Sequence, residues 1–234
     1  MDLSPYRPTT SYTISAFLSL PSGSKIVCLA MTCASLPTRR RVSNTLSPIQ
    51  SAQLFTAYRR SRNLGVPLNC HLSINWAFAP GGLHPVVRWF RFSDCARRWL
   101  RERGVPFTWV YVWERGVGET QHLHLVLHVP TGFHADFKPK VADWVRASTD
   151  SGGFQDRAVD VRFQRTPSLT GLMKYLIKDA DRATRQRFDA EKNWPQRGRV
   201  EGKRSEVSLN LRDTSWPDLG DGPVVLETFV VQAA

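Results

Sequence analysis

Two segments of strict alternation restrict the fold of this chain more than any other feature. Residues 68–76 have apolar side chains at every even position and polar ones at every odd position, and residues 122–129 have aliphatic side chains at every odd position. Since successive side chains of a strand point to opposite faces, both segments are predicted to be strands with one buried face. The chain must therefore build a sheet with a set of polar side chains opposite its core.

The remaining pattern predicts an α+β protein. The expected elements in chain order are a helix at 47–65, a strand at 68–76, a helix at 93–104, strands at 107–114 and 122–129, a helix with Pro139 in its first turn, a strand at 159–163 and a helix at 167–190. The six elements from the strand at 68–76 onward match the ferredoxin-like, split βαβ arrangement. That topology has an antiparallel sheet with helices on one face, makes the two alternating strands central neighbours, and leaves the other face open for an active site.

Composition divides the chain into three regions. Residues 1–46 are rich in Ser, Thr and Pro and have no periodicity, which predicts a disordered leader, with Met31 as an alternative start. Residues 47–192 contain the predicted domain. Residues 193–234 form a basic C-terminal extension, with one more strand expected within 224–231. This extension is either a clamp on a DNA backbone or a solvated run of charge.

The charge of the chain indicates a polyanionic partner. Lys and Arg number 32 against 20 Asp and Glu, a formal net charge of +12, which favours nucleic acid over a membrane surface. The chain has no apolar run of 18 residues, and its four cysteines form no CxxC pair. We therefore expect no transmembrane helix, zinc ribbon or disulfide framework, and a cytoplasmic or nucleoid-associated protein. No Gly-x-x-x-x-Gly-Lys-Ser/Thr motif is present, so nothing implies the use of ATP.

The second alternating strand places two imidazoles where they can share one cation. His122 and His124 are two residues apart, so they project in parallel from the open face. Glu114 joins them if it lies opposite His122 in the hairpin, whereas a slip of one residue would send it to the other face. A carboxylate with two imidazoles suits Mg²⁺ or Mn²⁺. Glu119 and His128 are spare candidates, and the alternative is that these histidines are ordinary polar residues of an exposed strand.

The predicted helix at 167–190 has a tyrosine at the edge of its apolar arc. Tyr175 lies at this edge, and Lys178 follows one turn later on the same side. An ammonium group beside a phenol stabilises the phenolate and can donate a hydrogen bond to a phosphate, so the pair suits nucleophilic attack on a phosphodiester. The alternative is a boundary tyrosine with its hydroxyl in water.

These features together resemble the HUH endonuclease superfamily, specifically the single-tyrosine rolling-circle replication initiators of plasmids, filamentous phages and circular single-stranded DNA elements. The likeness covers residues 66–185. It rests on the His-Leu-His motif at 122–124, on the acidic Glu114 across the hairpin, and on the Tyr-Leu-Ile-Lys motif at 175–178 of a later helix. The HUH motif alone is a weak signal, and the combination on a matching topology is more specific.

The resemblance implies that the domain at 47–192 nicks and rejoins single-stranded DNA at the start of rolling-circle replication, through a 5′-phosphotyrosine. The roles it implies are metal ligands at His122, His124 and Glu114, a nucleophile at Tyr175, a group that orients or activates it at Lys178, and DNA contacts at Asn69, His71 and Ser73. Leu72-Ser73-Ile74 is only an approximate match to the family's first motif. The implied partners are single-stranded DNA or a hairpin origin, a host helicase and a host polymerase.

Three alternatives remain open. A single-tyrosine transposase of the same superfamily would share the chemistry, although those enzymes typically have glutamine where this chain has Lys178. A non-catalytic module would bind nucleic acid through exposed aromatic side chains on the open face, where this sequence places polar residues such as Asn69, His71 and His122. An inactive initiator retained only for DNA binding is the third alternative.

Overall fold

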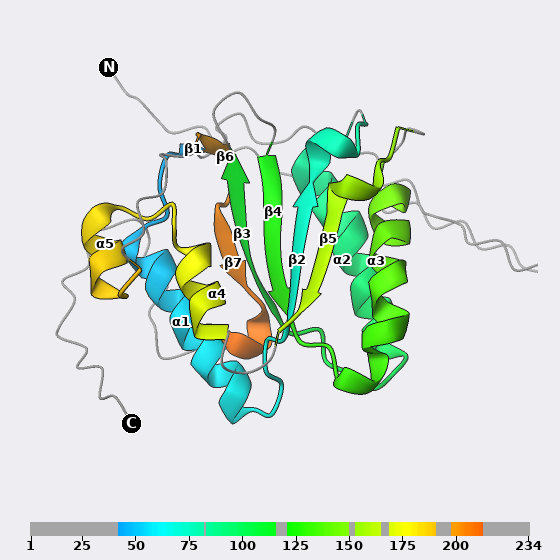
Figure 1. Cartoon of the computed structure of the whole chain (residues 1–234), viewed down its shortest axis with the longest axis horizontal. Coiled ribbons are helices and arrows are strands. Elements are labelled where there is room, and N and C mark those ends of the chain that lie inside the picture. Colours follow the sequence, from blue (N-terminus) through cyan, green and yellow to red (C-terminus); the bar gives the residue numbers. More distant parts are fainter. Residues whose placement is uncertain are drawn as a thin grey trace, which may run out of the picture. The chain divides into compact units, whose positions relative to one another are not determined.

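A five-stranded antiparallel sheet forms the frame of the protein. The computed structural model describes residues 42–81, 83–115, 121–149, 153–164, 169–190 and 198–212. The strand order is β5-β2-β4-β3-β7 (Figure 1). The strands are β2 (Cys70–Asn75), β3 (Trp109–Arg115), β4 (Gln121–Leu127), β5 (Val159–Phe163) and β7 (Ser205–Val207), and a separate two-stranded sheet pairs β1 (Val42–Ser43) with β6 (Val200–Glu201). The predicted α+β class is confirmed.

The two alternating segments are adjacent strands with the predicted parity. β2 pairs with β4, and β4 pairs with β3 in a register that puts Glu114 directly opposite His122. Leu72 and Leu123 face the core and are fully buried. Because Glu114 lies directly opposite His122, the carboxylate and the imidazoles emerge from the same face of the sheet.

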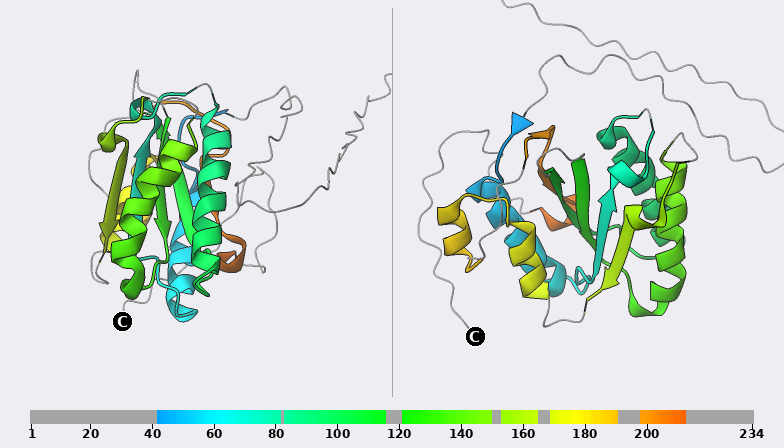
Figure 2. Two further views of the ribbon diagram at one scale, coloured as in Figure 1. Left: turned by 90° about the vertical axis from the view of Figure 1, so that its right-hand side faces the viewer. Right: turned by 45° about the horizontal axis from the view of Figure 1, so that its top comes forward.

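Helices cover both faces of this sheet, which corrects the prediction of helices on one face only. α2 (Pro85–Arg101) and α3 (His134–Ala147) pack on the aliphatic side of β2 and β4. α1 (Pro48–Asn63) and α4 (Leu169–Leu176) lie on the other side (Figures 1 and 2).

Three valines explain why the second face needs a cover. Val110, Val112 and Val126 have the parity of the polar residues, yet they are fully buried in a second apolar cluster with side chains of α1 and α4. Leaving this apolar floor exposed to water would cost free energy in proportion to its area. The predicted open face is therefore limited to its other side, at β5, where Asp160 and Arg162 are exposed.

The helix starts follow local capping, and the start of α2 differs from the prediction. Ser47 caps α1 and forms a capping box with Gln50, as expected from the Ser-Pro start. α2 begins well before the predicted Ser93, because Pro85 occupies the first helical turn and the His84 side chain accepts from the backbone N–H of Val86.

Within the described part of the chain, no helix is both long and apolar enough to cross a membrane.

The single helix predicted at 167–190 is two helices. α4 ends at Leu176, and α5 (Arg182–Arg187) begins after Asp181, whose side chain accepts from the backbone N–H of Thr184. The break places Lys178 in a turn. Short 3₁₀ helices occupy Trp76–Phe78, Thr131–Phe133, Asp156–Ala158 and Leu209–Leu211.

The described structure extends beyond both predicted boundaries of the domain at 47–192. Leu46, placed in the leader, is fully buried and donates its backbone N–H to the carbonyl of Asp179. At the other end, β7 of the predicted extension pairs with β3 and completes the sheet. The folded part therefore includes segments on both sides of 47–192. Met31 and the strand expected within 224–231 lie outside the described residues.

Candidate metal centre and tyrosine site

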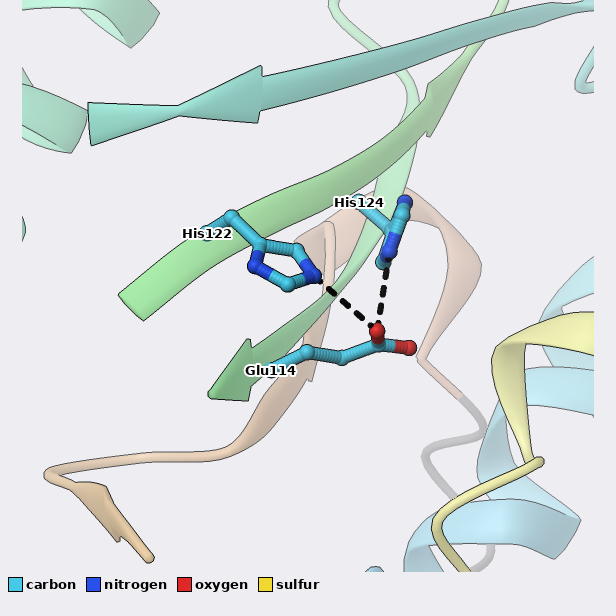
Figure 3. Close-up of side chains that lie close together, drawn as sticks. All are labelled: Glu114, His122 and His124. Carbon is cyan, nitrogen blue, oxygen red and sulfur yellow. Dashed lines mark hydrogen bonds and ion pairs between the residues drawn. The ribbon is translucent and has the colours of Figure 1, made fainter. Parts of the chain in front are cut away.

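Glu114, His122 and His124 form a compact group on the face that carries α4. Nε2 of His122 lies 3.2 Å and Nε2 of His124 lies 3.0 Å from the same carboxylate atom, Oε2 of Glu114 (Figure 3). One ligand atom from each residue lies within 4.8 Å of the others. Glu114 is fully buried and His124 nearly so. The sequence prediction that these three side chains converge is confirmed, and the group could hold a metal ion.

Lys178 is a fourth, unexpected member of this group. Its Nζ lies 2.7 Å from Oε1 of Glu114, and neither side chain has exposed surface. The helical periodicity of a continuous helix placed Lys178 outside the apolar arc, whereas the end of α4 at Leu176 turns it inward. A buried ammonium without a counter-charge would be costly, so the ion pair explains why this lysine is tolerated there.

The charges within the group are set by burial and by these partners. Burial would raise the pKa of Glu114, but hydrogen bonds from His122 and His124 together with the Lys178 ammonium hold it far below the usual carboxyl range. Burial lowers the pKa of His124 despite the neighbouring carboxylate. The group therefore contains an ionised Glu114 and a neutral His124.

Tyr175 is half-buried. It lies beside the Glu114–His122–His124 set, which we call the metal group because it could hold a metal ion. Its ring centroid is 5.2 Å from that of His124 in an edge-on arrangement, and Nζ of Lys178 is 3.4 Å from the same ring centroid. Leu172 and Leu176 of α4 are buried against the valine floor of the sheet. Packing of this apolar side therefore brings the edge of the helix, and with it Tyr175, next to the histidines.

His71 contacts the metal group instead of the solvent. It is only 8% exposed, and its Nε2 lies 3.3 Å from Nδ1 of His124. Burial, followed by the effects of His124 and Arg162, lowers the pKa of His71 to about 3, so its ring is neutral. A residue predicted to contact DNA thus contacts His124, a candidate metal ligand.

The other predicted residues have different surroundings. The Asn69 side chain donates to the carbonyl of Val129 and accepts from its backbone N–H. These two hydrogen bonds hold the segment that follows β4. Ser73 lies directly opposite His124 in the β2–β4 pair and is half-buried. His128 donates from Nδ1 to the carbonyl of Pro67 and is not part of the metal group. Glu119 lies outside the described residues.

Arg204 is a buried residue that sequence reasoning missed. Its guanidinium is 3.2 Å from Asp179, and it donates to the carbonyls of Ser43 and Gly198. It therefore ties the turn that carries Lys178 to the first strand and to the segment before β6. The sequence offers no signal for this role, because Arg204 is one of many basic residues in the extension.

We expect Arg204→Met to lower the free energy of unfolding by about 3 kcal/mol, because it leaves the buried Asp179 carboxylate without its counter-charge. Urea unfolding followed by circular dichroism measures this change. Lys203→Met is the matched control, since the adjacent Lys203 is exposed and pairs with Glu206 at the surface, where such pairs contribute less than about 1 kcal/mol. Equal losses in the two variants would contradict the assignment.

The chemistry of the donor atoms fits a divalent cation. Two imidazole nitrogens and a carboxylate oxygen form a site that leaves coordination positions for water or substrate. The Glu114 carboxylate is compensated by Lys178, so a cation would have to compete with this ammonium. Comparison of the chain with models of protein families, with curated proteins and with solved structures finds no match in any of the three.

Proposed function

We propose that this protein is a metal-dependent, single-tyrosine endonuclease of the HUH type, which nicks and rejoins single-stranded DNA in rolling-circle replication. The observation that carries the proposal is the placement of Tyr175 against His124, with His122 and Glu114 completing a metal group. A phenol next to a two-histidine, one-carboxylate group suits phosphodiester transfer, whereas a purely structural cluster has no need of a half-exposed tyrosine.

The strand order of the sheet supports the proposal. β2, β3, β4 and β5 lie in the order β5-β2-β4-β3, all antiparallel, and α2 and α3 share one face. This is the order of a ferredoxin-like, split βαβ unit. We propose that β7, α1 and α4 are additions to that unit, which carry the nucleophile and close half of the second face.

The reaction would proceed by an in-line transfer at phosphorus. A bound Mg²⁺ or Mn²⁺ would neutralise charge that develops on the phosphodiester oxygens. The Tyr175 oxygen would form the new bond to phosphorus as the bond to the 3′ oxygen breaks. The phenolic proton of the tyrosine passes to solvent, and the released 3′ oxygen takes up a proton to become a hydroxyl. The 5′-phosphotyrosine retains a phosphodiester bond, so the reverse reaction rejoins the strand.

Residues of this chain would prepare that step. Lys178 lies between Glu114 and the Tyr175 ring, so loss of its pairing with Glu114 on metal binding would free an ammonium beside the nucleophile. Such an ammonium would favour the phenolate and would contact the phosphate. The substrate would approach over the exposed half of the face, where Asp160 and Arg162 form an ion pair at the β5 edge.

The basic character of the chain is consistent with a DNA substrate. A formal net charge of +12 predicts affinity for the phosphate backbone that weakens steeply with salt. We propose that the substrate is single-stranded DNA or a hairpin origin. A host helicase and a host polymerase would then extend the released 3′ end.

Covalent capture tests the proposal. Purified protein is incubated with labelled oligonucleotides, as a random single-stranded pool and as a set of hairpins, in Mn²⁺ or in EDTA. The expected result is an adduct that survives SDS, forms only in Mn²⁺ and disappears on nuclease digestion. Tight, salt-sensitive DNA binding without an adduct would reject the nickase in favour of a DNA-binding module. Absence of both adduct and binding would reject the DNA substrate.

A further inference from the structure

We propose that His71 is a positioning residue of the metal centre, which orients the His124 ring and selects the tautomer that presents Nε2 to the cation. This inference deepens the proposed function and rests on it for the presence of a metal. It concerns a residue on β2, a strand that contributes no ligand to the group.

The sheet register explains how His71 reaches His124. His71 lies directly opposite Val126 in the β2–β4 pair, so His124 is its diagonal neighbour on the same face. Diagonal neighbours in an antiparallel pair are within reach of ring side chains. The two rings lie 5.5 Å apart between centroids and 27° from parallel, and their facing nitrogens are 3.3 Å apart. His71 is therefore in hydrogen-bond contact with the nitrogen of His124 that does not face Glu114.

An imidazole is suited to this position because it can donate or accept. The ionised Glu114 carboxylate can only accept, so Nε2 of His124 donates to it. Nδ1 of the neutral His124 is then the acceptor for Nε2–H of His71. A metal ligand must offer the lone pair of Nε2, which moves the proton of His124 to Nδ1. His71 then accepts a hydrogen bond from Nδ1–H of His124, as outer partners of ligating histidines do. The same contact is thus satisfied in both states.

The contact also restricts the orientation of the ring. His124 is held at Nε2 by Glu114, at Nδ1 by His71 and on its side by Tyr175. Removing the His71 contact would allow the ring to turn and would leave Nδ1 without its partner. Metal affinity should therefore fall although no ligand has been changed.

The test is a Mn²⁺ titration in the absence of DNA, with free Mn²⁺ counted by electron paramagnetic resonance. His71→Leu should raise the dissociation constant by about tenfold or more, the effect typical of a lost outer partner. His71→Gln, which can also donate or accept at the Nε2 position, should recover most of the affinity. His128→Leu is the matched control, because His128 lies on the same face but bonds Pro67, and it should bind Mn²⁺ as the wild type does.

Three results would overturn the inference: His71→Leu with wild-type affinity, equal losses in His71→Gln and His71→Leu, or a wild type that does not bind Mn²⁺. If His71→Leu fails to fold, imidazole ¹⁵N spectra of the wild type with Zn²⁺ as a diamagnetic probe decide the question. The expected spectrum has a proton on Nδ1 of His124, and a bare Nδ1 overturns the inference. Wild-type metal binding without a DNA adduct would instead reject the nickase and leave this inference standing.

Discussion

Replacement of Tyr175 by Phe should reduce the SDS-resistant DNA adduct at least about a thousandfold, because the variant has no oxygen to attack phosphorus. The change keeps the ring, which contacts His124 and the Lys178 ammonium. Folding and metal affinity should therefore stay close to those of the wild type. Gel quantification of the adduct, urea unfolding and Mn²⁺ titration on the same preparation measure the three quantities.

Tyr58→Phe is the matched control for this prediction. Tyr58 is buried in the same apolar cluster as α4, so the variant loses a hydroxyl from the same layer without touching the metal group. It should form the adduct at the wild-type level. An adduct that persists in Tyr175→Phe would refute the nucleophile assignment, and mass spectrometry of the linked peptide would then identify the residue responsible.

Replacement of Glu114 by Gln should have two large and separable effects. Loss of the carboxylate removes one of three ligands, so we expect Mn²⁺ affinity to fall by at least about a hundredfold, together with the adduct. It also leaves the buried Lys178 ammonium without its counter-charge, which should lower the free energy of unfolding by about 3 kcal/mol or more. Mn²⁺ titration and urea unfolding measure the two effects independently.

A double variant separates these effects. Glu114→Gln with Lys178→Met removes both charges of the pair, so stability should recover while metal affinity stays low. Lys178→Met alone removes the cation that competes for Glu114 and should bind Mn²⁺ more tightly than the wild type. Stability that does not recover in the double variant would contradict the ion pair between Glu114 and Lys178. Weaker Mn²⁺ binding in Lys178→Met would contradict the competition between this ammonium and the metal for Glu114.

The two alternating strands and the shared face of His122 and His124 were predictable because side-chain direction in a strand is a local property. Alternation within 68–76 and 122–129 separates the core face from the polar face without reference to the rest of the chain. Glu114 joins His122 on this face because the hairpin pairs the two residues directly, a register that the sequence left open. The adjacency of β2 and β4 was expected from the split βαβ arrangement that the order of the elements matches.

The surroundings of the group were not predictable in this way. Lys178 is buried because α4 ends at Leu176, and the extrapolated helical periodicity did not include that end. His71 has the polar parity expected of an exposed residue, yet it lies against His124 under the cover of this face. Arg204 gains its role from Asp179 and Ser43, which are distant in sequence.

The sequence by itself therefore determined the α+β class and the shared face of His122 and His124, since both depend on the period of side chains along a strand. The pairing of the hairpin then decided that Glu114 lies opposite His122. The tertiary structure alone decided that α1 and α4 close half of the polar face, that β7 extends the sheet and that Lys178 enters the metal group. These features depend on burying surfaces from segments that are far apart in the chain, and the free energy of such packing is not written in any local pattern.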